Sequence, residues 1–543
     1  MTHPAAETAV TGKDAPRLLP DDEHNRLLLR HTHPPDWVNP TPKPLYDLVV
    51  LGAGTAGLTA AGGCAAVGGT VALIERKFTG GDCLISGCVP SKGLISASRV
   101  AAHVQRAGVY GIRVPAGTSV DFPAVMERMR RLRAQISPAD SVEHLAKAGV
   151  DVFLGDGRFV SPEGVEVIPP LATRPNGPSF VERSASGGVA GGGINGARLR
   201  FKKAVIATGG RADVPPIPGL KEAGYLTNET LFELTAQPRR LVIIGGGPIG
   251  CEMAQTFRRF GSDVIVIHNA GHILNREDAD AAAIIQQAFV REGIQLVLSA
   301  KTQRVERRGD EKAVTVESSG RTTQITCDAI LISAGRAPNL EGLNLEAAGV
   351  AYEKTGVTVN DRLQTTNARV FAAGDISAPF KFTHTANALG RMAMINALFW
   401  GRNRMSRLIV PWCTYTDPEI AHVGLYEQQA KERGYPVTTL TVPLRENDRA
   451  VLDGEDEGFV RVHLKTGTDQ MLGATVVAAH AGDLLSYFTL AMTMGKGLST
   501  LAGPIYPYPT QAEVIKRLAN THLQTKLKPW VKRVLRAILA IKR

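Results

Sequence analysis

The sequence predicts a multidomain α/β protein, and three observations lead to this prediction. The chain has 543 residues, more than one hydrophobic core usually holds, so three or four domains are expected. A buried strand, a glycine turn, a helix and a second strand follow one another twice, at 47–76 and 241–268. A further region, 409–513, mixes strand and turn signals. We therefore predict two Rossmann-like dinucleotide-binding domains and a C-terminal α+β domain.

Composition and charge exclude several classes of protein. Hydrophobic residues make up 44% and charged residues 21%, as in ordinary soluble proteins. No apolar run approaches the roughly 18–20 residues that span a bilayer, and residues 1–26 lack a secretory signal. The net charge is +11, but nine Lys and Arg with no acid lie in 514–543. The rest of the chain is nearly neutral, which argues against a nucleic-acid-binding body and favours a cytoplasmic protein with a basic tail.

Segments outside the two repeats are less regular. Prolines in 33–44 exclude a regular helix, so the N-terminal arm is expected to run extended over a surface. Strands are predicted at 165–168 and 198–208, and the low-complexity stretch 184–197 between them is interpreted as a surface loop rather than a binding loop. Apolar residues recur at helical spacing after Pro529, with Lys and Arg between them, which predicts a basic amphipathic helix.

The first glycine motif is Gly52-x-Gly54-x-x-Gly57, between a strand and a helix. Its first glycine permits the turn, the second lets a pyrophosphate approach the backbone, and the third lets helix and strand pack closely. The phosphates would meet free N–H groups at the helix N-terminus. Glu75 ends the next strand, where a carboxylate accepts hydrogen bonds from ribose hydroxyls. This context favours a dinucleotide site over a purely structural turn.

The second motif is Gly245-x-Gly247-x-x-Gly250, which also follows a strand. Its next strand ends in His268 instead of an acid. A carboxylate there would favour NAD and repel a 2′-phosphate, so its absence permits NADPH. No adjacent arginine pair offers to bind that phosphate, and both nucleotides stay open, with NADPH favoured.

A close cysteine pair lies in GGDCLISGCVPSK (80–92). Cys83 and Cys88 are five residues apart, which an ideal helix separates by about 7.5 Å, too far for a disulfide. The pair can bridge only if the helix is distorted, and Gly87 and Pro90 could permit this. Metal binding is the rival interpretation, but no nearby His or Cys completes a set of four ligands. The other four cysteines are expected to be small buried residues.

These motifs together resemble those of the pyridine nucleotide–disulfide oxidoreductases, the group of glutathione reductase, dihydrolipoamide dehydrogenase and mercuric reductase. The resemblance covers roughly 45–515. It rests on GAGTAGL, GGDCLISGCVPSK, AVIATGG (204–210), GGGPIGCE (245–252), LISAGRAPN (331–339), FAAGDI (371–376), PWCTYTDPEIAHVGL (411–425) and YPTQAE (508–513). It implies FAD and NAD(P)H as cofactors and a homodimer, because the family's sites use residues from both subunits.

The resemblance also assigns roles to residues. Cys83 would be the interchange thiol that meets the substrate, and Cys88 the thiol next to the flavin. Lys92 would lie near flavin N5 and pair with Glu252. The remaining expected cofactor contacts are Gly81, Thr208, Gly209, Asp375 and Thr383 for FAD, and Gly335 for NAD(P). Asp375 would hold the ribityl chain, and Thr383 would open a helix aimed at the flavin. His384 is as consistent with a packed or capping histidine as with a catalytic one.

One position departs from the thiol-reducing members of the family. Those proteins place a histidine before Pro-Thr as the acid–base group for disulfide exchange, with a glutamate after it. Here the stretch is YPTQAE, so Tyr508 stands in the histidine position and Glu513 in that of the glutamate. A tyrosine with a pKa of about 10 is a poor base near pH 7. Mercuric reductases also have tyrosine there, although this chain lacks their C-terminal cysteine pair and N-terminal CxxC module.

The resemblance therefore implies a mercuric reductase-like enzyme that reduces a metal ion or another soft acceptor. No structural metal is expected, and Cys83 and Cys88 would be transient Hg(II) ligands. The alternatives are a dihydrolipoamide dehydrogenase-type thiol–disulfide reductase, an NAD(P)H:quinone reductase, and a scaffold protein with idle FAD. The tail from Pro529 either lies on an anionic membrane, at the inner face, or packs on the protein or its dimer mate.

The expected domains follow the family's order, and the boundaries below are predictions. They are an arm (1–44), the FAD domain (45–215 and 336–408), the NAD(P) domain (216–335), an interface domain (409–520) and a basic amphipathic helix (521–543).

Overall fold

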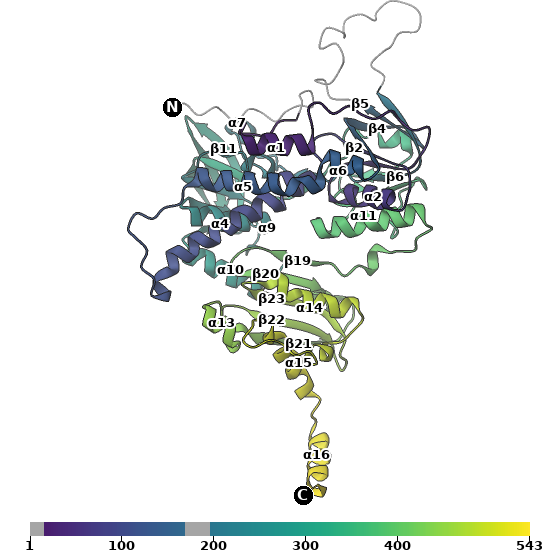
Figure 1. The fold of residues 1–543 in the computed structure, drawn as a ribbon. Helices are drawn as coiled ribbons and strands as arrows, with labels where there is room; N and C mark the ends of the chain where they lie inside the picture. Colours follow the sequence, from purple (N-terminus) through teal and green to yellow (C-terminus); the bar gives the residue numbers. More distant parts are fainter. Residues whose placement is uncertain (1–15, 169–195, 543) are drawn as a thin grey trace, which may run out of the picture. The chain divides into compact units, whose positions relative to one another are not determined.

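The structure is a computed structural model that describes residues 16–168 and 196–542 (Figure 1). The predicted loop at 184–197 therefore lies outside the described residues, except for its last two positions. The chain divides into two compact units. The first comprises Met1–Gly245, Arg259–Ile265 and Lys301–Leu408, and the second comprises Gly246–Arg258, Val266–Ala300 and Ile409–Arg543.

The first unit is centred on a seven-stranded sheet with the order β3-β2-β1-β6-β5-β4, in which β18 also pairs with β6. Its strands are β1 (Tyr46–Leu51), β2 (Val71–Glu75), β3 (Val150–Leu154), β4 (Asp156–Ser161), β5 (Gly164–Ile168), β6 (Ala197–Ile206) and β18 (Val370–Ala372). The pairs of β1 with β2 and β6 are parallel, with Leu48 opposite Val71 and Lys203. Side chains of β1 are buried on both faces, as expected for a central parallel strand.

Two helices cover one face of this sheet (Figure 1). They are α2 (Thr55–Ala66) and α11 (Thr383–Leu398), which approach so closely that a Cβ on Gly390 would lie 2.2 Å from the carbonyl oxygen of Ala56. The other face carries a separate core of larger side chains, including Phe153, Phe159 and Phe201. The first glycine motif thus begins at the carboxyl end of β1 and continues into α2, so a buried strand and a packed helix hold its two ends.

The N-terminal arm contains a helix that the sequence analysis did not predict, α1 (Glu23–Thr32). Asp22 caps it by accepting the Asn25 N–H at 2.8 Å and also pairs with Arg130. Leu28 packs in one cluster with Leu84, a residue of the predicted redox segment. Residues 33–44 form no helix, in agreement with their prolines. The described part of the arm, residues 16–44, therefore includes a packed helix, whereas the sequence predicts an extended segment.

The remaining helices of this unit are α3 (Gly81–Ile85), α4 (Cys88–Arg106), α5 (Phe122–Ile136), α6 (Val142–Lys147), α7 (Leu220–Ala223) and α8 (Asn228–Leu231). Its smaller sheets are β11-β12-β13, formed by Ala300–Arg308, Glu311–Ser318 and Arg321–Cys327, and β15-β7, formed by Arg336–Pro338 and Gly210–Ala212. Two two-residue strands, β16 (Tyr352–Glu353) and β17 (Gly356–Val357), pair with each other.

The second glycine motif lies after β8 (Arg240–Ile244), which pairs in parallel with β14 (Ala329–Ile332). The complete strand order around it is β10-β9-β8-β14. The other elements of this region are β9 (Asp263–Ile267), β10 (Gln295–Val297), α9 (Pro248–Phe260) and α10 (Ala279–Arg291). The motif therefore has the strand–turn–helix context that the sequence predicts.

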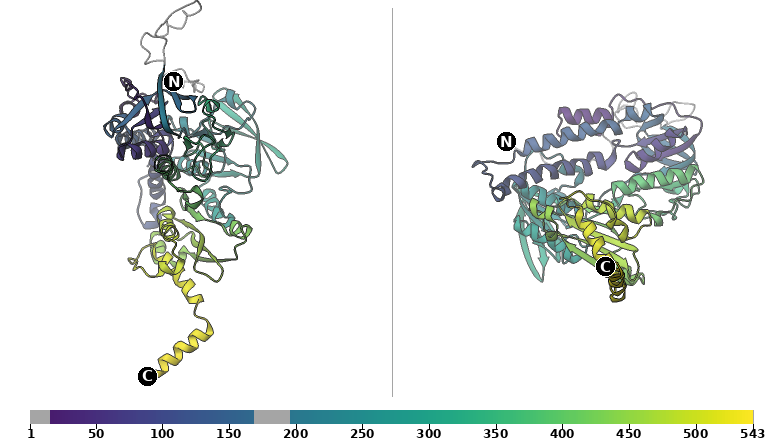
Figure 2. Two further views of the ribbon diagram at one scale, coloured as in Figure 1. Left: turned by 90° about the vertical axis from the view of Figure 1, so that its right-hand side faces the viewer. Right: turned by 60° about the horizontal axis from the view of Figure 1, so that its bottom comes forward.

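The second unit contains a five-stranded antiparallel sheet with the order β19-β20-β23-β22-β21. Its strands are β19 (Pro411–Thr414), β20 (Glu419–Gly424), β21 (Val437–Pro443), β22 (Phe459–Lys465) and β23 (Met471–Ala478). Its helices are α12 (Glu427–Glu432), α13 (Asp448–Asp453), α14 (Ala481–Thr493), α15 (Glu513–Thr525) and α16 (Pro529–Ile541). The core packs α14 and α15 against the sheet, whose strands are yellow-green in Figure 2.

The predicted C-terminal helix is shorter than expected, because residues 521–525 belong to α15 and α16 begins at Pro529. Within 16–168 and 196–542, no helix is both long enough and apolar enough to cross a membrane.

Candidate functional site

The first glycine turn fits a dinucleotide closely. Gly52 has a φ of 101°, and a Cβ there would lie 2.4 Å from the carbonyl oxygen of Ala207. A Cβ on Gly57 would lie 1.8 Å from the carbonyl oxygen of Gly52. At Gly54 the nearest heavy atom is 4.0 Å away, so the backbone stays open on that side. Two glycines are therefore required by packing, whereas the middle one leaves room for a pyrophosphate.

Glu75 supports this turn from the end of β2. Its carboxylate accepts the N–H groups of Ala53 and Lys77, both at 2.6 Å. Burial raises the pKa of this carboxyl group, and the two N–H donors oppose the increase. A carboxylate held in this way still has lone pairs for ribose hydroxyls. The open backbone at Gly54 and this acceptor together fit the FAD that the resemblance implies.

The cysteine segment is attached directly to the glycine turn. The N–H of Gly80 donates to the carbonyl oxygen of Ala53 at 2.9 Å. A Cβ on Gly81, which has a φ of 57°, would lie 2.7 Å from the Cα of Gly54. The segment then forms α3, breaks at Ser86 and Gly87, and starts α4 at Cys88. Because the helix is interrupted, the two cysteines are not separated by five continuous helical residues.

Cys83 and Cys88 are thiols rather than a disulfide in the structure, the former half-buried and the latter exposed. A hydrogen bond between them, together with burial, raises the pKa of Cys83 strongly. The Sγ of Cys88 is 3.2 Å from the Oγ1 of Thr383, the first residue of α11. The predicted residues Cys83, Cys88 and Thr383 thus come together at one helix N-terminus, whose partial positive charge favours a thiolate.

An arginine that the sequence analysis missed links this segment to Asp375. Arg336 donates through Nε to Asp375 at 3.1 Å and also pairs with Asp82, the residue before Cys83. Although burial lowers the pKa of Arg336, the two carboxylates raise it overall. Its carbonyl oxygen accepts from Lys381 at 2.6 Å. The only signal in the sequence was its place in LISAGRAPN, where the resemblance singled out Gly335 instead.

Thr208 and Gly209 lie just after the end of β6. The hydroxyl of Thr208 donates to the carbonyl oxygen of Asn339 at 3.0 Å. The Asn339 N–H in turn donates to the carbonyl oxygen of Gly209 at 3.0 Å. Gly335 accepts the N–H of Asp213 at 3.0 Å through its carbonyl oxygen. These contacts hold two chain segments together, and they leave the predicted cofactor contacts of these three residues as proposals.

The second glycine turn resembles the first in its backbone. Gly245 has a φ of 119°, and a Cβ there would lie 2.5 Å from the carbonyl oxygen of Ser333. At Gly247 no heavy atom of the described chain lies within 4 Å of a Cβ position. Gly250, the third glycine of the motif, lies within α9. This turn therefore has the same open middle position as the first.

His268 stands where the first turn has Glu75. Its Nδ1 accepts the N–H of Gly246 at 3.1 Å, so the neutral ring carries its proton on Nε2. That Nε2 is buried and has no hydrogen-bond partner among the described residues. Burial, and secondarily His272, lowers the pKa of His268, which is consistent with a neutral ring. An unpaired buried N–H donor fits a nucleotide oxygen, and this is the observation that supports NAD(P) at the second turn.

The other predicted catalytic residues have separate surroundings. In the second unit, Glu252 is buried on α9 and accepts the N–H of Tyr415 at 3.0 Å. Lys92 lies half-buried on α4, one turn after Cys88, in the first unit. The expected pairing of Lys92 with Glu252 remains a prediction. His384 follows Thr383 on α11, and its ring stacks on Phe382 with 5.4 Å between centroids.

Tyr508 is 72% exposed, and its hydroxyl donates to Asp448 at 3.0 Å. This hydrogen bond raises the pKa of Tyr508, which makes the phenol a still weaker base near neutral pH. Glu513 begins α15 and accepts the N–H of Thr510 at 3.4 Å. The two residues are thus placed in the second unit, where their predicted catalytic roles remain untested.

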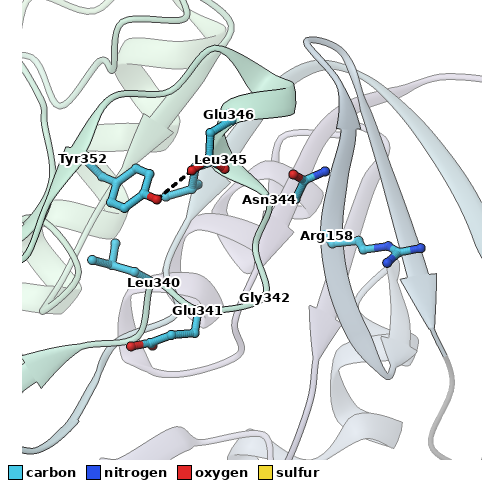
Figure 3. A pocket seen from close by; sticks show the side chains of 8 residues that line it. All are labelled: Arg158, Leu340, Glu341, Gly342, Asn344, Leu345, Glu346 and Tyr352. Atoms are coloured by element: carbon cyan, nitrogen blue, oxygen red, sulfur yellow. Dashed lines mark hydrogen bonds between the residues drawn. The ribbon is translucent and has the colours of Figure 1, made fainter.

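A surface pocket of about 510 Å³ lies elsewhere in the first unit (Figure 3). It is lined by Arg158, Leu340, Glu341, Gly342, Asn344, Leu345, Glu346 and Tyr352. Within it the Tyr352 hydroxyl donates to Glu346 at 2.6 Å. None of these residues belongs to the predicted site. Within the described ranges, no three His, Cys, Asp or Glu side chains gather as metal ligands.

Comparisons with known proteins agree with this geometry. Residues 46–390 match the family described as pyridine nucleotide-disulphide oxidoreductase, and residues 410–519 match its dimerisation domain. A mercuric reductase from Bacillus cereus is 35% identical over 87% of this chain and 70% of its own length. A mercuric reductase from Staphylococcus aureus is 32% identical over 88% and 82%. A dihydrolipoyl dehydrogenase from Bacillus subtilis (strain 168) is also 32% identical, over 87% and 97%.

A solved structure of a flavoprotein disulfide reductase is also similar to this chain. The Cu(II) complex of the HOCl-induced flavoprotein disulfide reductase RclA from Escherichia coli superposes with a TM-score of 0.75 at 27% identity. The superposition covers 88% of this chain and 100% of that one.

Proposed function

The chain belongs to the pyridine nucleotide–disulphide oxidoreductase family, and we propose that it passes electrons from NADPH through FAD and Cys83–Cys88 to a soft metal ion. The family uses FAD and NAD(P)H, and the dimerisation domain supports a homodimer. When bound, FAD supplies the two-electron carrier between the nicotinamide and the cysteine pair. The net reaction would consume NADPH and Hg(II) and release NADP⁺, a proton and elemental mercury.

The observation that carries the proposal is the thiol pair together with Tyr508. Two adjacent sulfur atoms at the N-terminus of α11 suit a soft ion, which binds thiolates in place of their protons. Thr383 would orient Cys88, and the raised pKa of Cys83 would keep its proton in place until the ion displaces it.

The same residues argue against a disulfide acceptor. Reducing a disulfide requires a group that protonates the leaving thiolate. The phenol of Tyr508, with its pKa raised by Asp448, donates to a carboxylate and is poorly suited to this proton transfer. A metal ion needs no such proton. Activity on lipoamide, as the similarity to dihydrolipoyl dehydrogenases would suggest, is therefore the weaker alternative.

NADPH is proposed as the reductant because His268 offers the nucleotide a hydrogen-bond donor rather than an acceptor. Its buried Nε2–H can donate to an oxygen of a 2′-phosphate, whereas a carboxylate would repel that group. The preference is expected to be moderate, since a neutral imidazole adds no positive charge.

The decisive test is an anaerobic titration of the purified protein with NADPH and then NADH, followed by visible absorbance. A long-wavelength thiolate–flavin band after two electrons is the expected result. Hg(II), lipoamide and a quinone are then added separately, and Hg(II) should remove the band fastest. The matched control is Cys83→Ser/Cys88→Ser, which should bind FAD but show neither the band nor Hg(II) reduction.

Two outcomes would contradict the proposal. If lipoamide removes the band and Hg(II) does not, the chain is a thiol–disulfide reductase. If the double variant keeps full quinone turnover and the wild type shows no band, the cysteines lie outside the electron path and a quinone reductase is the better conclusion.

A further inference from the structure

The last helix, α16 (Pro529–Ile541), presents an apolar surface that nothing in the described chain covers. None of its residues is buried. Six of its large apolar side chains are exposed, by 45% at Ile538 to 85% at Ile541. The others in this range are Trp530, Val534, Leu535 and Leu539. Leaving this much apolar surface in water is unfavourable, so a partner is expected to cover it.

The two faces of α16 differ sharply in chemistry. At 3.6 residues per turn, Trp530, Val534, Ile538 and Ile541 fall within about 80° of one another around the helix axis, and Leu535 and Leu539 widen this apolar face to about 180°. Lys532, Arg533 and Arg536 occupy the opposite side. From Val514 to the end, the chain carries nine Lys and Arg and no acid. The helix therefore combines a broad apolar face with a narrower basic face that carries no acid.

We propose that α16 lies on the surface of a bilayer that contains anionic lipids, with Trp530 and its apolar neighbours inserted. Charge complementarity selects this occupant, because basic side chains beside an apolar face attract anionic headgroups. Trp530 suits the interface between headgroups and acyl chains. A helix of 13 residues is about 20 Å long and too short to span the roughly 30 Å hydrocarbon core, so it lies in the plane.

The same charges disfavour a second copy as the occupant. Pairing two α16 helices would concentrate the Lys and Arg of both segments in one region with no acid in either to offset their repulsion, whereas anionic headgroups neutralise these charges. The proposal is independent of the electron acceptor, since it uses no residue of the nucleotide turns or the cysteine segment.

The test is flotation of the full-length, FAD-loaded protein with phosphatidylcholine vesicles, with and without phosphatidylglycerol. Binding is expected only to vesicles that contain phosphatidylglycerol, and it should weaken as salt is raised. Intrinsic fluorescence supplies a second readout, because insertion of Trp530 should shift its emission to shorter wavelength.

A pair of matched variants separates the apolar face from the basic one. Ile538→Gln removes an inserted side chain and should reduce partition onto anionic vesicles by roughly tenfold or more. Ala540→Gln makes the same new side chain on the basic face and should leave partition unchanged. Lys532→Gln/Arg536→Gln should reduce partition onto anionic vesicles by roughly thirtyfold. All variants should keep FAD and NADPH oxidation, which shows that the body is folded.

Three results would overturn the proposal. One is no binding to anionic vesicles at low salt. Another is equal loss of partition in Ile538→Gln and Ala540→Gln. The third is a smaller assembly for Ile538→Gln than for wild type by light scattering, without vesicles, because this would show that a second copy covers the face.

Discussion

The two glycine turns share a backbone but differ in the side chain that supports each one. In the first, the Glu75 carboxylate accepts the N–H of Ala53, and in the second, the His268 ring accepts the N–H of Gly246. Both N–H groups belong to the residue after the first glycine of the motif. Both turns also keep an open position at the middle glycine, Gly54 or Gly247. An acid and a neutral imidazole therefore hold equivalent backbone positions.

The difference lies in what each side chain has left for a ligand. A carboxylate offers only acceptors, which suit ribose hydroxyls and repel a 2′-phosphate. The imidazole of His268 has used its acceptor, and its free Nε2–H is a donor. The residue at the end of the second strand therefore differs between the two turns in what it can offer a nucleotide, acceptors at Glu75 and a donor at His268.

The largest effect is expected from an alanine at the third glycine of the first turn. In Gly57→Ala the new Cβ would lie 1.8 Å from the Gly52 carbonyl oxygen, so we expect a loss of about 3 kcal/mol of stability and of bound FAD. Thermal unfolding and the flavin content of the purified protein measure this. Gly247→Ala is the control, because its Cβ meets no atom. The Gly247→Ala variant should fold and hold FAD but have a raised KM for NADPH. Normal flavin content in Gly57→Ala would contradict the packing argument.

The next effect is loss of the negative charge at the first turn. Glu75→Gln keeps the size of the side chain but removes its charge, and hydrogen bonds to charged groups contribute roughly 1.5–3 kcal/mol. We expect FAD to bind apoprotein roughly tenfold to a hundredfold more weakly. Fluorescence titration with FAD measures the affinity, and the His268→Gln variant should leave it unchanged. Equal FAD affinity in Glu75→Gln and wild type would remove the assigned role of this carboxylate.

A smaller effect should follow from making the second turn like the first. His268→Glu can still accept the Gly246 N–H, but it places a negative charge where a 2′-phosphate would lie. We expect kcat/KM for NADPH to fall roughly tenfold relative to NADH, about 1.4 kcal/mol. Steady-state kinetics with both nucleotides give the ratio, and His268→Gln, which stays neutral, should change it less. A ratio unchanged by the glutamate would show that His268 does not face the 2′-position.

The smallest effect concerns pH. Because burial lowers the pKa of His268, the folded protein binds fewer protons than the unfolded chain as pH falls through about 6.5. Stability should therefore decrease from pH 8 to pH 5.5, and His268→Gln should remove part of that decrease. Thermal unfolding of both proteins across this range provides the comparison. An identical pH dependence in the two proteins would show that His268 is not held neutral by burial and by the Gly246 N–H.

Features that depend on neighbours in the chain could be predicted from the sequence. The glycine turns, Glu75 and His268 at strand ends, and the cysteine pair all lie within about thirty residues of the motif that identifies them. The helix from Pro529 could be predicted for the same reason, since its apolar spacing is local. Helix α1 was missed, although Asp22 is an ordinary N-cap, because the surrounding prolines dominated the interpretation.

Other features could not be predicted because distant residues form them. Arg336 pairs with Asp375 and also with Asp82, which lies 254 positions earlier in the chain, and Thr383 meets Cys88 across 295 positions. The role of Leu28 beside Leu84 depends on a helix that packs from the N-terminal arm.

The sequence by itself determined that two nucleotide-binding units, a redox-type cysteine pair and a basic amphipathic tail are present. Only the tertiary structure decided which side chains complete each site. It joined Asp82 to Asp375 through Arg336, turned the Nε2–H of His268 into an unpaired buried donor, and left the apolar face of α16 uncovered. The physical reason is that turns and helices follow from local backbone preferences, whereas burial and unpaired donors depend on contacts between residues far apart in the chain.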